Sequence, residues 1–380
     1  MMKRLQFITA GESHGPALSV IIHGLPAGFH VKVDDINHQL KRRQSGFGRG
    51  DRMKIETDQV EVLSGLRNSI TLGSPLAFII RNRDFENWKE IMDPLHAKTS
   101  KKISIPRPGH ADYAGMIKYQ TDDLRNILER ASARETAARI IVGSVCRQFF
   151  EDIGISFSSI VTQIGTVSIS ENDIPPVSSW QQADTSPVRC PDLFTSQRMI
   201  DAISKAQKEG DSLGGIFKVA VQHLPIGLGS HTQWNERLTS MISSHILGIP
   251  AIRGIAFGLG FDVANLPGSR VHDPFTIKEG KISRTSNNCG GIEGGMSNGC
   301  DLLFSAVMKP IPTLTKPLSS VDLQTGKETV AHKERTDSCA VPAASVVAEN
   351  VTAIPLLDAF LLKYGGDSWG ETLKHWKVSL

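Results

Sequence analysis

Two segments in the first part of the chain resemble two segments in the second part, in the same order. Residues 11–28 align with residues 210–227 without a gap, and in both a glycine-rich turn precedes an apolar run and a Leu-Pro-x-Gly turn. A second pair follows, because residues 64–78 resemble residues 290–304. Short apolar runs between such turns are typical of β-strands. The repeat predicts a single large α+β domain of two pseudo-symmetric halves. The alternative is chance similarity between two common strand–turn units.

A capping box predicts one helix directly. Ser132 has the place of the N-cap, and Glu135 the place of the residue that reaches back to it. Apolar residues then recur on one face as far as about Asp152, where we expect the helix to end. The remaining expected elements are helices over 31–40 and 236–247, strands over 53–63 and 74–81, a surface excursion over 84–105 and a loop over 171–192.

Composition limits the class of protein. The chain has 380 residues, a formal net charge of +3 and five scattered cysteines without a Cys-x-x-Cys pair. Reduced thiols and a cytoplasmic location are therefore expected. No apolar run approaches the ~20 residues that span a bilayer, so no membrane partner is expected. The predicted domain covers residues 1–365, and a C-terminal tail, residues 366–380, is expected to pack on it or contact another subunit.

Positive charge is concentrated in residues 41–52. Five of these twelve residues are Lys or Arg, three are Gly, and only Phe47 is strongly apolar. Such a segment cannot form a core helix, but it can form a mobile loop that orders over a strongly anionic ligand. Arg/Gly loops also bind RNA. The near-neutral remainder of the chain and the single interleaved aromatic residue argue against a nucleic-acid partner.

Two histidines lie in turns where a ligand could approach closely. His14 is part of Gly-Glu-Ser-His-Gly-Pro, and His110 follows Arg107 in Arg-Pro-Gly-His. Imidazole can donate or accept a proton near neutral pH, and a neighbouring cation suits an anionic ligand. For His14 the alternative is a turn histidine bonded to the backbone, and for His110 it is an exposed loop histidine.

Other motifs narrow the chemistry. Residues 290–299 form a glycine-rich loop, but Met296 stands where a phosphate-binding P-loop needs Lys. The sequence has no dinucleotide fingerprint, which argues against a nicotinamide oxidoreductase. No His/Cys/Asp cluster has metal-ligand spacing, so no metal is expected. Residues 309–313 and 335–337 each hold a cation beside a polar group, as many surface segments do.

Taken together, seven motifs in this order resemble chorismate synthase. They are Gly-Glu-Ser-His-Gly-Pro (11–16), Arg-Arg-Gln-x-Gly-Phe-Gly-Arg-Gly-x-Arg-Met (42–53), Arg-Pro-Gly-His-Ala-Asp (107–112), Leu-Glu-Arg-Ala-Ser-Ala-Arg-Glu-Thr (128–136), Gly-Gly-Ile-Glu-Gly-Gly-Met-Ser-Asn-Gly (290–299), Met-Lys-Pro-Ile-Pro-Thr (308–313) and Arg-Thr-Asp-Ser (335–338).

The resemblance implies a carbon–oxygen lyase of the shikimate pathway. Its reaction is the anti 1,4-elimination of phosphate from 5-enolpyruvylshikimate 3-phosphate to give chorismate, with reduced FMN as cofactor. NADPH is possible as the source of reducing equivalents, and the sequence does not decide between it and an external reductant. The family fold implied is an α+β domain with central β-sheet layers sandwiched by helices, assembled as a homotetramer.

The resemblance also implies roles for residues. His14 would protonate the departing phosphate, His110 would stabilise the reduced flavin anion, and Asp337 would assist removal of the ring proton through the flavin. Substrate or NADP contacts would come from Arg43, Arg49, Arg107 and Arg134. Cofactor contacts would come from Arg130, Ala131, Ser132, Pro250, Ala251, Gly294, Lys309, Pro310, Ile311, Pro312, Thr313 and Arg335.

The chain departs from the family pattern at one of these positions. Pro250 stands where the family has Asn, so an asparagine amide contact to the flavin would be missing there. Phe47 for Tyr and Ser45 for Gly are milder differences.

Overall fold

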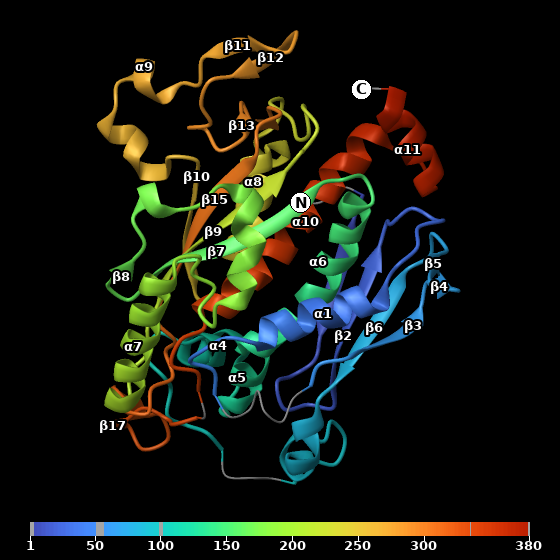
Figure 1. Ribbon diagram of the computed structural model, residues 1–380. Helices are drawn as coiled ribbons and strands as arrows, with labels where there is room; N and C mark the ends of the chain where they lie inside the picture. Colours follow the sequence, from blue (N-terminus) through green and yellow to red (C-terminus); the bar gives the residue numbers. More distant parts are fainter. Residues whose placement is uncertain (1–3, 51–56, 99–101, 335, 379–380) are drawn as a thin grey trace.

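Two antiparallel sheets organise the computed structural model, which describes residues 4–50, 57–98, 102–334 and 336–378 (Figure 1). The first sheet has the strand order β1 (Gln6–Ala10), β2 (Ala17–His23), β6 (Leu76–Arg81), β3 (Val60–Ser64). The second has the order β10 (Ile252–Phe257), β15 (Leu302–Met308), β9 (Gly215–Gln222), β7 (Ser156–Ile164), β8 (Val167–Ser168).

The central strand pairs of the two sheets have the same register. Val20 of β2 lies opposite Phe78 of β6, and Val219 of β9 lies opposite Phe304 of β15. These are the positions that the sequence repeat places in correspondence. The repeat therefore appears as equivalent strand pairs, in which strands far apart along the chain are neighbours.

The elements that correspond between the two halves occur in the same order along the chain. The first half runs β1, β2, α1 (Val33–Gln44), β3, β6 and α6 (Thr136–Glu151). The second runs β7, β9, α8 (Leu238–Leu247), β10, β15 and α10 (Val341–Tyr364). The α+β class and the two-half organisation are thus confirmed.

The layers lie in a different order from the expected one. Helix α6 packs on β1 and β2, α10 packs on β7 and β9, and the two helices pack on each other. The helices therefore form the middle layer, with one sheet on either side (Figure 1). At their crossing the backbones nearly touch, because a Cβ on Gly143 would lie 2.4 Å from the Asn350 carbonyl oxygen. Only glycine fits there.

Helix α10 is the centre of the core. Its 24 residues are apolar enough to cross a membrane by length and composition, which corrects the expectation that no apolar run approaches that length. Nearly all of this helix is buried inside the protein. A helix that is apolar on all sides is typical of a core as well as of a membrane span.

The other elements complete the domain. The expected helices appear as α1 and α8, the strand over 74–81 as β6, and the described part of 53–63 contains β3. Residues 366–380 include helix α11, whose Trp369 packs edge-on against Phe149 at a centroid distance of 5.1 Å. The domain limits remain a prediction.

The remaining helices are α3 (Lys89–Met92), α4 (Asp112–Tyr119), α5 (Arg125–Ala131), α7 (Leu193–Glu209), α9 (Gly268–Val271) and α11 (Trp369–Val378). The remaining strands are β4 (Leu66–Arg67), β5 (Ile70–Thr71), β11 (Phe275–Lys278), β12 (Lys281–Arg284), β13 (Ile292–Glu293), β14 (Met296–Ser297), β16 (Ser319–Asp322) and β17 (Lys327–Val330). The 3-10 turns are η1 (Arg83–Asn87), η2 (Ala133–Glu135), η3 (Glu171–Asp173), η4 (Val177–Thr185), η5 (Trp234–Glu236) and η6 (Gly260–Asn265).

The start of α6 differs from the capping box expected there. Ser132 accepts a hydrogen bond from the backbone amide of Arg134 at 3.3 Å, so it does cap the turn η2. The Glu135 carboxylate instead accepts from Arg139 at 2.9 Å and from the Thr9 hydroxyl at 2.9 Å. The Glu135 carboxylate thus accepts from an arginine and a threonine hydroxyl, whereas the capping box predicted that it would accept from the backbone amide of Ser132.

Candidate active site

Both halves of the domain contribute to one cavity of about 410 Å³. The turn between β1 and β2, the end of α1 and the turn η2 come from the first half. Residues 250–253, 308–313 and 336–347 come from the second half. The predicted residues that line it are His14, His110, Asp337, Arg43, Arg49, Arg107, Arg134, Ala131, Ser132, Pro250, Ala251, Lys309, Ile311, Pro312 and Thr313.

The other predicted residues lie elsewhere. Arg130 lines a neighbouring hollow that shares Ala131, Ser132 and Pro250 with the cavity. Pro310 is exposed between two lining residues. Among the described residues, Gly294 belongs to the β13–β14 hairpin, whose strands pair with each other, and does not line the cavity. Arg335 lies outside the described residues.

His14 is held by a buried carboxylate. The Nδ1 atom of His14 lies 2.9 Å from Oε2 of Glu129 and 3.0 Å from its Oε1. Burial alone would raise the pKa of Glu129, but the hydrogen bonds and charge of its partners, chiefly His14, outweigh burial and lower it. Trp88 stacks on the imidazole ring at a centroid distance of 4.1 Å. Both the edge and the face of the imidazole are therefore fixed.

His110 has a similar arrangement. Its Nδ1 lies 2.5 Å from Oδ1 of Asp112, and Oδ2 of the same carboxylate accepts from Nε of Arg107 at 2.9 Å. Burial would raise the pKa of Asp112, but the hydrogen bonds from His110 and Arg107 lower it well below its usual value. Arg107 also donates to the Thr313 hydroxyl at 3.0 Å, which connects this turn to residues 309–313.

Two further arginines share one anion. Asp58 accepts from Nη1 of Arg134 at 2.5 Å and from Nη1 of Arg43 at 3.4 Å. All three side chains are buried, and burial lowers the pKa of Arg43 to about 10 despite the opposing charge of Asp58. A guanidinium remains charged at neutral pH with such a pKa. Asp58 therefore keeps two cations at the cavity wall.

Asp337 contacts Arg49 and Gly50 of the basic segment, which is the cationic stretch of residues 41–52. Nη1 of Arg49 lies 2.7 Å from Oδ2 of Asp337, and the backbone amide of Gly50 donates to Oδ1 at 2.7 Å. The Gly48 carbonyl accepts from the backbone amide of Ser338 at 2.9 Å. Residues 41–44 of the segment also belong to the end of α1, with Arg43 buried, which corrects the expectation that the segment cannot form a core helix. The expected ordering of its glycine-rich part over a ligand stays a prediction.

Residues 249–253 and 308–313 of the second half line the cavity with backbone, apolar and cationic groups. Ala251 has a φ of +68°, and its carbonyl accepts from the backbone amide of Lys309 at 2.9 Å. Burial and the charge of Arg253 lower the pKa of Lys309. Crowded cations of this kind favour the binding of an anion. The Lys309 ammonium group donates to the Gly109 carbonyl at 2.5 Å.

Sequence reasoning missed several residues of this site. Asp112 lies within a quoted motif, where its spacing from His110 was a signal that could have identified it. Glu129 also lies in a motif, yet only the structure shows its contact with His14. Trp88 comes from the segment expected to be a surface excursion, and a lone tryptophan in a polar stretch was its only signal. Asp58 and Arg253 had no sequence signal.

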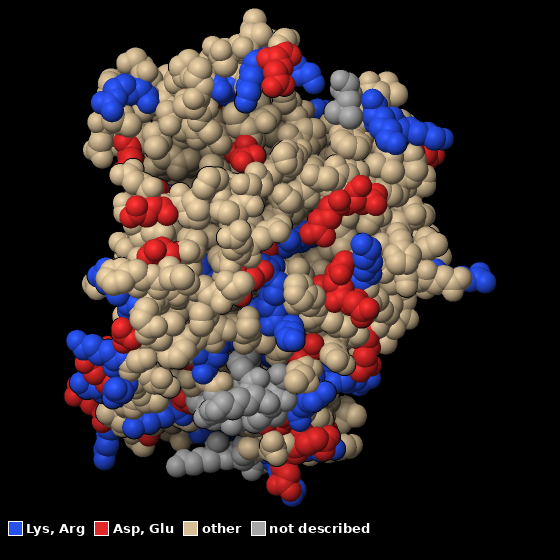
Figure 2. All heavy atoms as spheres, viewed as in Figure 1, with Lys and Arg blue, Asp and Glu red and all other residues tan. Residues whose placement is uncertain are grey.

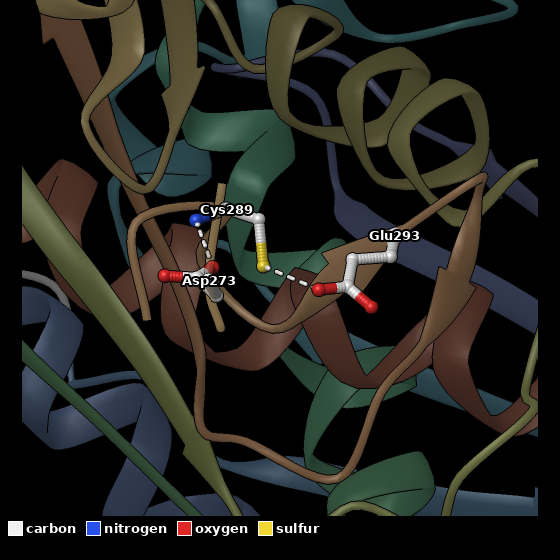
Figure 3. Close-up of side chains that lie close together, drawn as sticks. All are labelled: Asp273, Cys289 and Glu293. Carbon is white, nitrogen blue, oxygen red and sulfur yellow. Dashed lines mark hydrogen bonds between the residues drawn. The ribbon is translucent and has the colours of Figure 1, made fainter. Parts of the chain in front are cut away.

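Among the described residues, one group of potential metal ligands lies outside the cavity. The ligand atoms of Asp273, Cys289 and Glu293 lie within 4.8 Å of one another (Figure 3). Asp273, however, already accepts from the backbone amides of Asn288 and Cys289 at 2.7 and 3.0 Å. Glu293 is paired with Arg284, and burial raises the pKa of Cys289 to about 12. These bonds account for the cluster as a structural network, and the expected absence of a metal stays a prediction.

Surface charge is mixed in sign. Figure 2 shows Lys and Arg interspersed with Asp and Glu over the viewed face of the molecule. A nucleic-acid interface instead gathers cations in a patch or stripe. The cations of the cavity are thus a local feature within a nearly balanced chain.

Comparisons with known proteins identify the family of the chain. The sequence profile described as chorismate synthase matches residues 5–361. The chain is 47% identical to the chorismate synthase of Alkaliphilus metalliredigens over 98% of both chains, and 48% identical to that of Aquifex aeolicus over 99% of this chain and 97% of the relative. A crystal structure of chorismate synthase superposes with a TM-score of 0.80 at 38% identity, covering 100% of this chain and 98% of the other. The chain therefore belongs to the chorismate synthase family of carbon–oxygen lyases.

Proposed function

We propose that this enzyme of the shikimate pathway converts 5-enolpyruvylshikimate 3-phosphate into chorismate by anti 1,4-elimination of phosphate, with reduced FMN bound in the same cavity. The observation that carries the proposal is the convergence of Arg43, Arg49, Arg107 and Arg134 with two histidines on one cavity. The substrate has a phosphate and two carboxylates, and planar guanidinium groups match such oxygens in pairs.

The residues present fit a flavin. Ala131, Ser132, Pro250 and residues 311–313 give one wall small and apolar groups against which a flat ring can lie. Lys309 and Arg253 bring cations to the same side, and the lowered pKa of Lys309 indicates that an anionic group would stabilise them. Pro250 offers no amide, so its contact to a ring would be apolar. Reduced FMN, when bound, would supply an electron-rich ring beside the substrate.

The protein's own residues have distinct roles in the proposal. His14 donates a proton to the departing phosphate, and the four arginines hold the anionic groups of the substrate. His110, whose Nδ1 is occupied by Asp112, would stabilise the anionic form of the reduced flavin. Asp337 assists removal of the ring proton. Its carboxylate is kept in place by Arg49 and Gly50.

An anaerobic turnover assay tests the proposal. The protein is mixed with the substrate and FMN reduced by dithionite, and chorismate is measured by chromatography. Chorismate should form with reduced FMN and not with oxidised FMN. His14→Ala should bind flavin like the wild type but lose roughly 10²–10⁴-fold in turnover, the contribution of a general acid. Absence of chorismate with reduced FMN would contradict the proposal.

Three further properties belong to the proposal. NADPH is a possible reductant, and adding it with oxidised FMN under anaerobic conditions tests whether the enzyme reduces its own flavin. A homotetramer is expected, which light scattering coupled to size-exclusion chromatography would detect. A cytoplasmic location agrees with the five free cysteines.

A further inference from the structure

One buried carboxylate contacts the proposed proton donor and has no role in the account above. Glu129 lies on α5, and its side chain is only 1% exposed. Its two oxygens lie 2.9 and 3.0 Å from Nδ1 of His14, and Oε2 also accepts from the His14 backbone amide at 2.9 Å. The Glu129 carbonyl accepts from the Ser13 amide at 3.0 Å. Main-chain and side-chain bonds thus attach the histidine turn to α5.

The carboxylate is ionised at neutral pH. Burial opposes its charge, but His14 lies against it and Arg125 donates to Oε1 at 3.2 Å, so its pKa is lowered. An ionised carboxylate has only acceptor oxygens. The proton between Glu129 and the imidazole must therefore be on Nδ1 of His14.

An aromatic residue fixes the plane of the same imidazole. Trp88 stacks on His14 with an interplanar angle of 27°, and the Arg125 guanidinium lies 5.0 Å from the Trp88 ring centroid. Arg125 thus contacts both groups that surround the histidine. Rotation of the imidazole would cost the stacking contact and the carboxylate bond together.

We propose that Glu129 and Trp88 are positioning residues that hold His14 with Nδ1 protonated and Nε2 as the only ring nitrogen able to exchange a proton with the ligand. This inference rests on the proposed function. In the proposed elimination the carbon–oxygen bond breaks and phosphate leaves with its electron pair, while the ring C–H bond loses its proton with the help of Asp337 and its electron pair enters the new double-bond system. The departing phosphate takes the Nε2 proton of the imidazolium. Neutral His14 keeps its Nδ1 proton, which remains hydrogen bonded to the Glu129 carboxylate.

Glu129→Gln is the main test. The amide group can donate to Nδ1, which favours the opposite tautomer, and it removes the charge that stabilises the imidazolium. We expect kcat to fall roughly 10–100-fold, part of the contribution of a general acid, while KM changes by less than about 3-fold. The basic limb of the kcat profile should move to lower pH, because the cation loses its counter-charge.

Two readouts separate positioning from simple structural support. Long-range proton–nitrogen spectra of the imidazoles, with His14 assigned from His14→Gln, should show a protonated Nδ1 in the wild type and a protonated Nε2 in Glu129→Gln. In a His14→Ala background, Glu129→Gln should have no further effect on kcat, because the two residues act as one unit. An equal loss in both backgrounds would overturn the proposal, as would an unchanged tautomer.

A matched control measures the cost of removing a buried carboxylate elsewhere. Asp273→Asn removes a charge that is 8% exposed and hydrogen bonded to Ser286 and two amides, at a site that does not line the cavity. It should lower the melting temperature without changing kcat.

Two variants test Trp88. Trp88→Phe should keep most of the activity, because a phenyl ring can still stack on His14, whereas Trp88→Ala should lose it. If the wild type turns over and His14→Ala does not, unchanged kcat in Glu129→Gln refutes this inference alone. If the wild type makes no chorismate, the proposed function itself has failed.

Discussion

Asp337 and Arg49 form an ion pair of 2.7 Å that connects the basic segment to the residues before α10. The sequence had suggested Arg335 as the neighbour of this carboxylate, but that residue lies outside the described structure. The pair places a proposed catalytic carboxylate and a proposed substrate cation in direct contact. Each therefore affects the position of the other.

Asp337→Asn should damage chemistry more than binding. The amide keeps one acceptor oxygen, so it can accept from Arg49 or from Gly50 but not from both, and it cannot take a proton. Substrate affinity should stay within about 3-fold of the wild type, while the single-turnover rate of elimination falls by at least ~10². Rapid-quench measurements at saturating substrate provide the test. Recovery of the wild-type rate at saturation would show that Asp337 only supports Arg49.

Gly48→Ala should loosen the basic segment. Gly48 has a φ of +87°, and an added Cβ would lie 2.9 Å from Cγ2 of Ile203 and 3.2 Å from the Cys339 Cβ. The control is Gly326→Ala, whose φ is +68° with no atom within 4 Å of the added Cβ. Both changes cost about 1 kcal/mol of backbone strain, but only the first disturbs packing. Gly48→Ala should raise KM and speed proteolysis between residues 45 and 50. Equal behaviour of the two variants would contradict the assignment.

Asp58→Ala should destabilise the protein strongly. It leaves Arg43 and Arg134 buried without their shared anion, and breaking such a pair typically costs about 3–5 kcal/mol. Glu61→Ala breaks an exposed pair with Arg81 and should cost less than about 1 kcal/mol. The free energy of unfolding in urea measures both. Similar losses of unfolding free energy in the two variants would show that Asp58 does not stabilise the two buried arginines.

Acid should reveal the contribution of Asp273. Burial would raise its pKa, but hydrogen bonds from Ser286, Cys289 and Asn288 lower it from 3.8 to about 2. The unfolded state thus binds the proton more tightly, so the stabilisation is complete above the unfolded pKa and is lost as pH falls through the folded one. The difference in melting temperature between wild type and Asp273→Asn should be constant above about pH 5 and shrink between about pH 4 and 2. A difference independent of pH would contradict this assignment.

The sequence allowed the two repeated strand–turn units to be predicted, but neither the pairing of their strands nor the order of the layers. The repeat aligned Val20 with Val219 and Phe78 with Phe304, and in the structure Val20 lies opposite Phe78 just as Val219 lies opposite Phe304. Which layer becomes central depends on how the apolar faces of helices and sheets meet. Helix α10 is mostly apolar and is buried along nearly its whole length, including Glu349 and Asp358, as expected of a helix in the middle layer.

The site was predictable where its residues fall within motifs. Sequence motifs indicated many of the residues that line the cavity. The residues that support them through tertiary contacts could not be identified in this way. Glu129 meets His14 across 115 positions of sequence, and Asp58 meets Arg134 across 76. Neither separation corresponds to a helical or strand period, so no local pattern could reveal these contacts.

The most direct test of the central claim is a rapid-quench single turnover under anaerobic conditions. Enzyme with reduced FMN is mixed with less than one equivalent of 5-enolpyruvylshikimate 3-phosphate, and chorismate and inorganic phosphate are both measured over time. The account predicts that both products appear together in equal amounts, that neither appears with oxidised FMN, and that His14→Ala slows both equally. Phosphate release without chorismate, or equal rates with oxidised FMN, would contradict it.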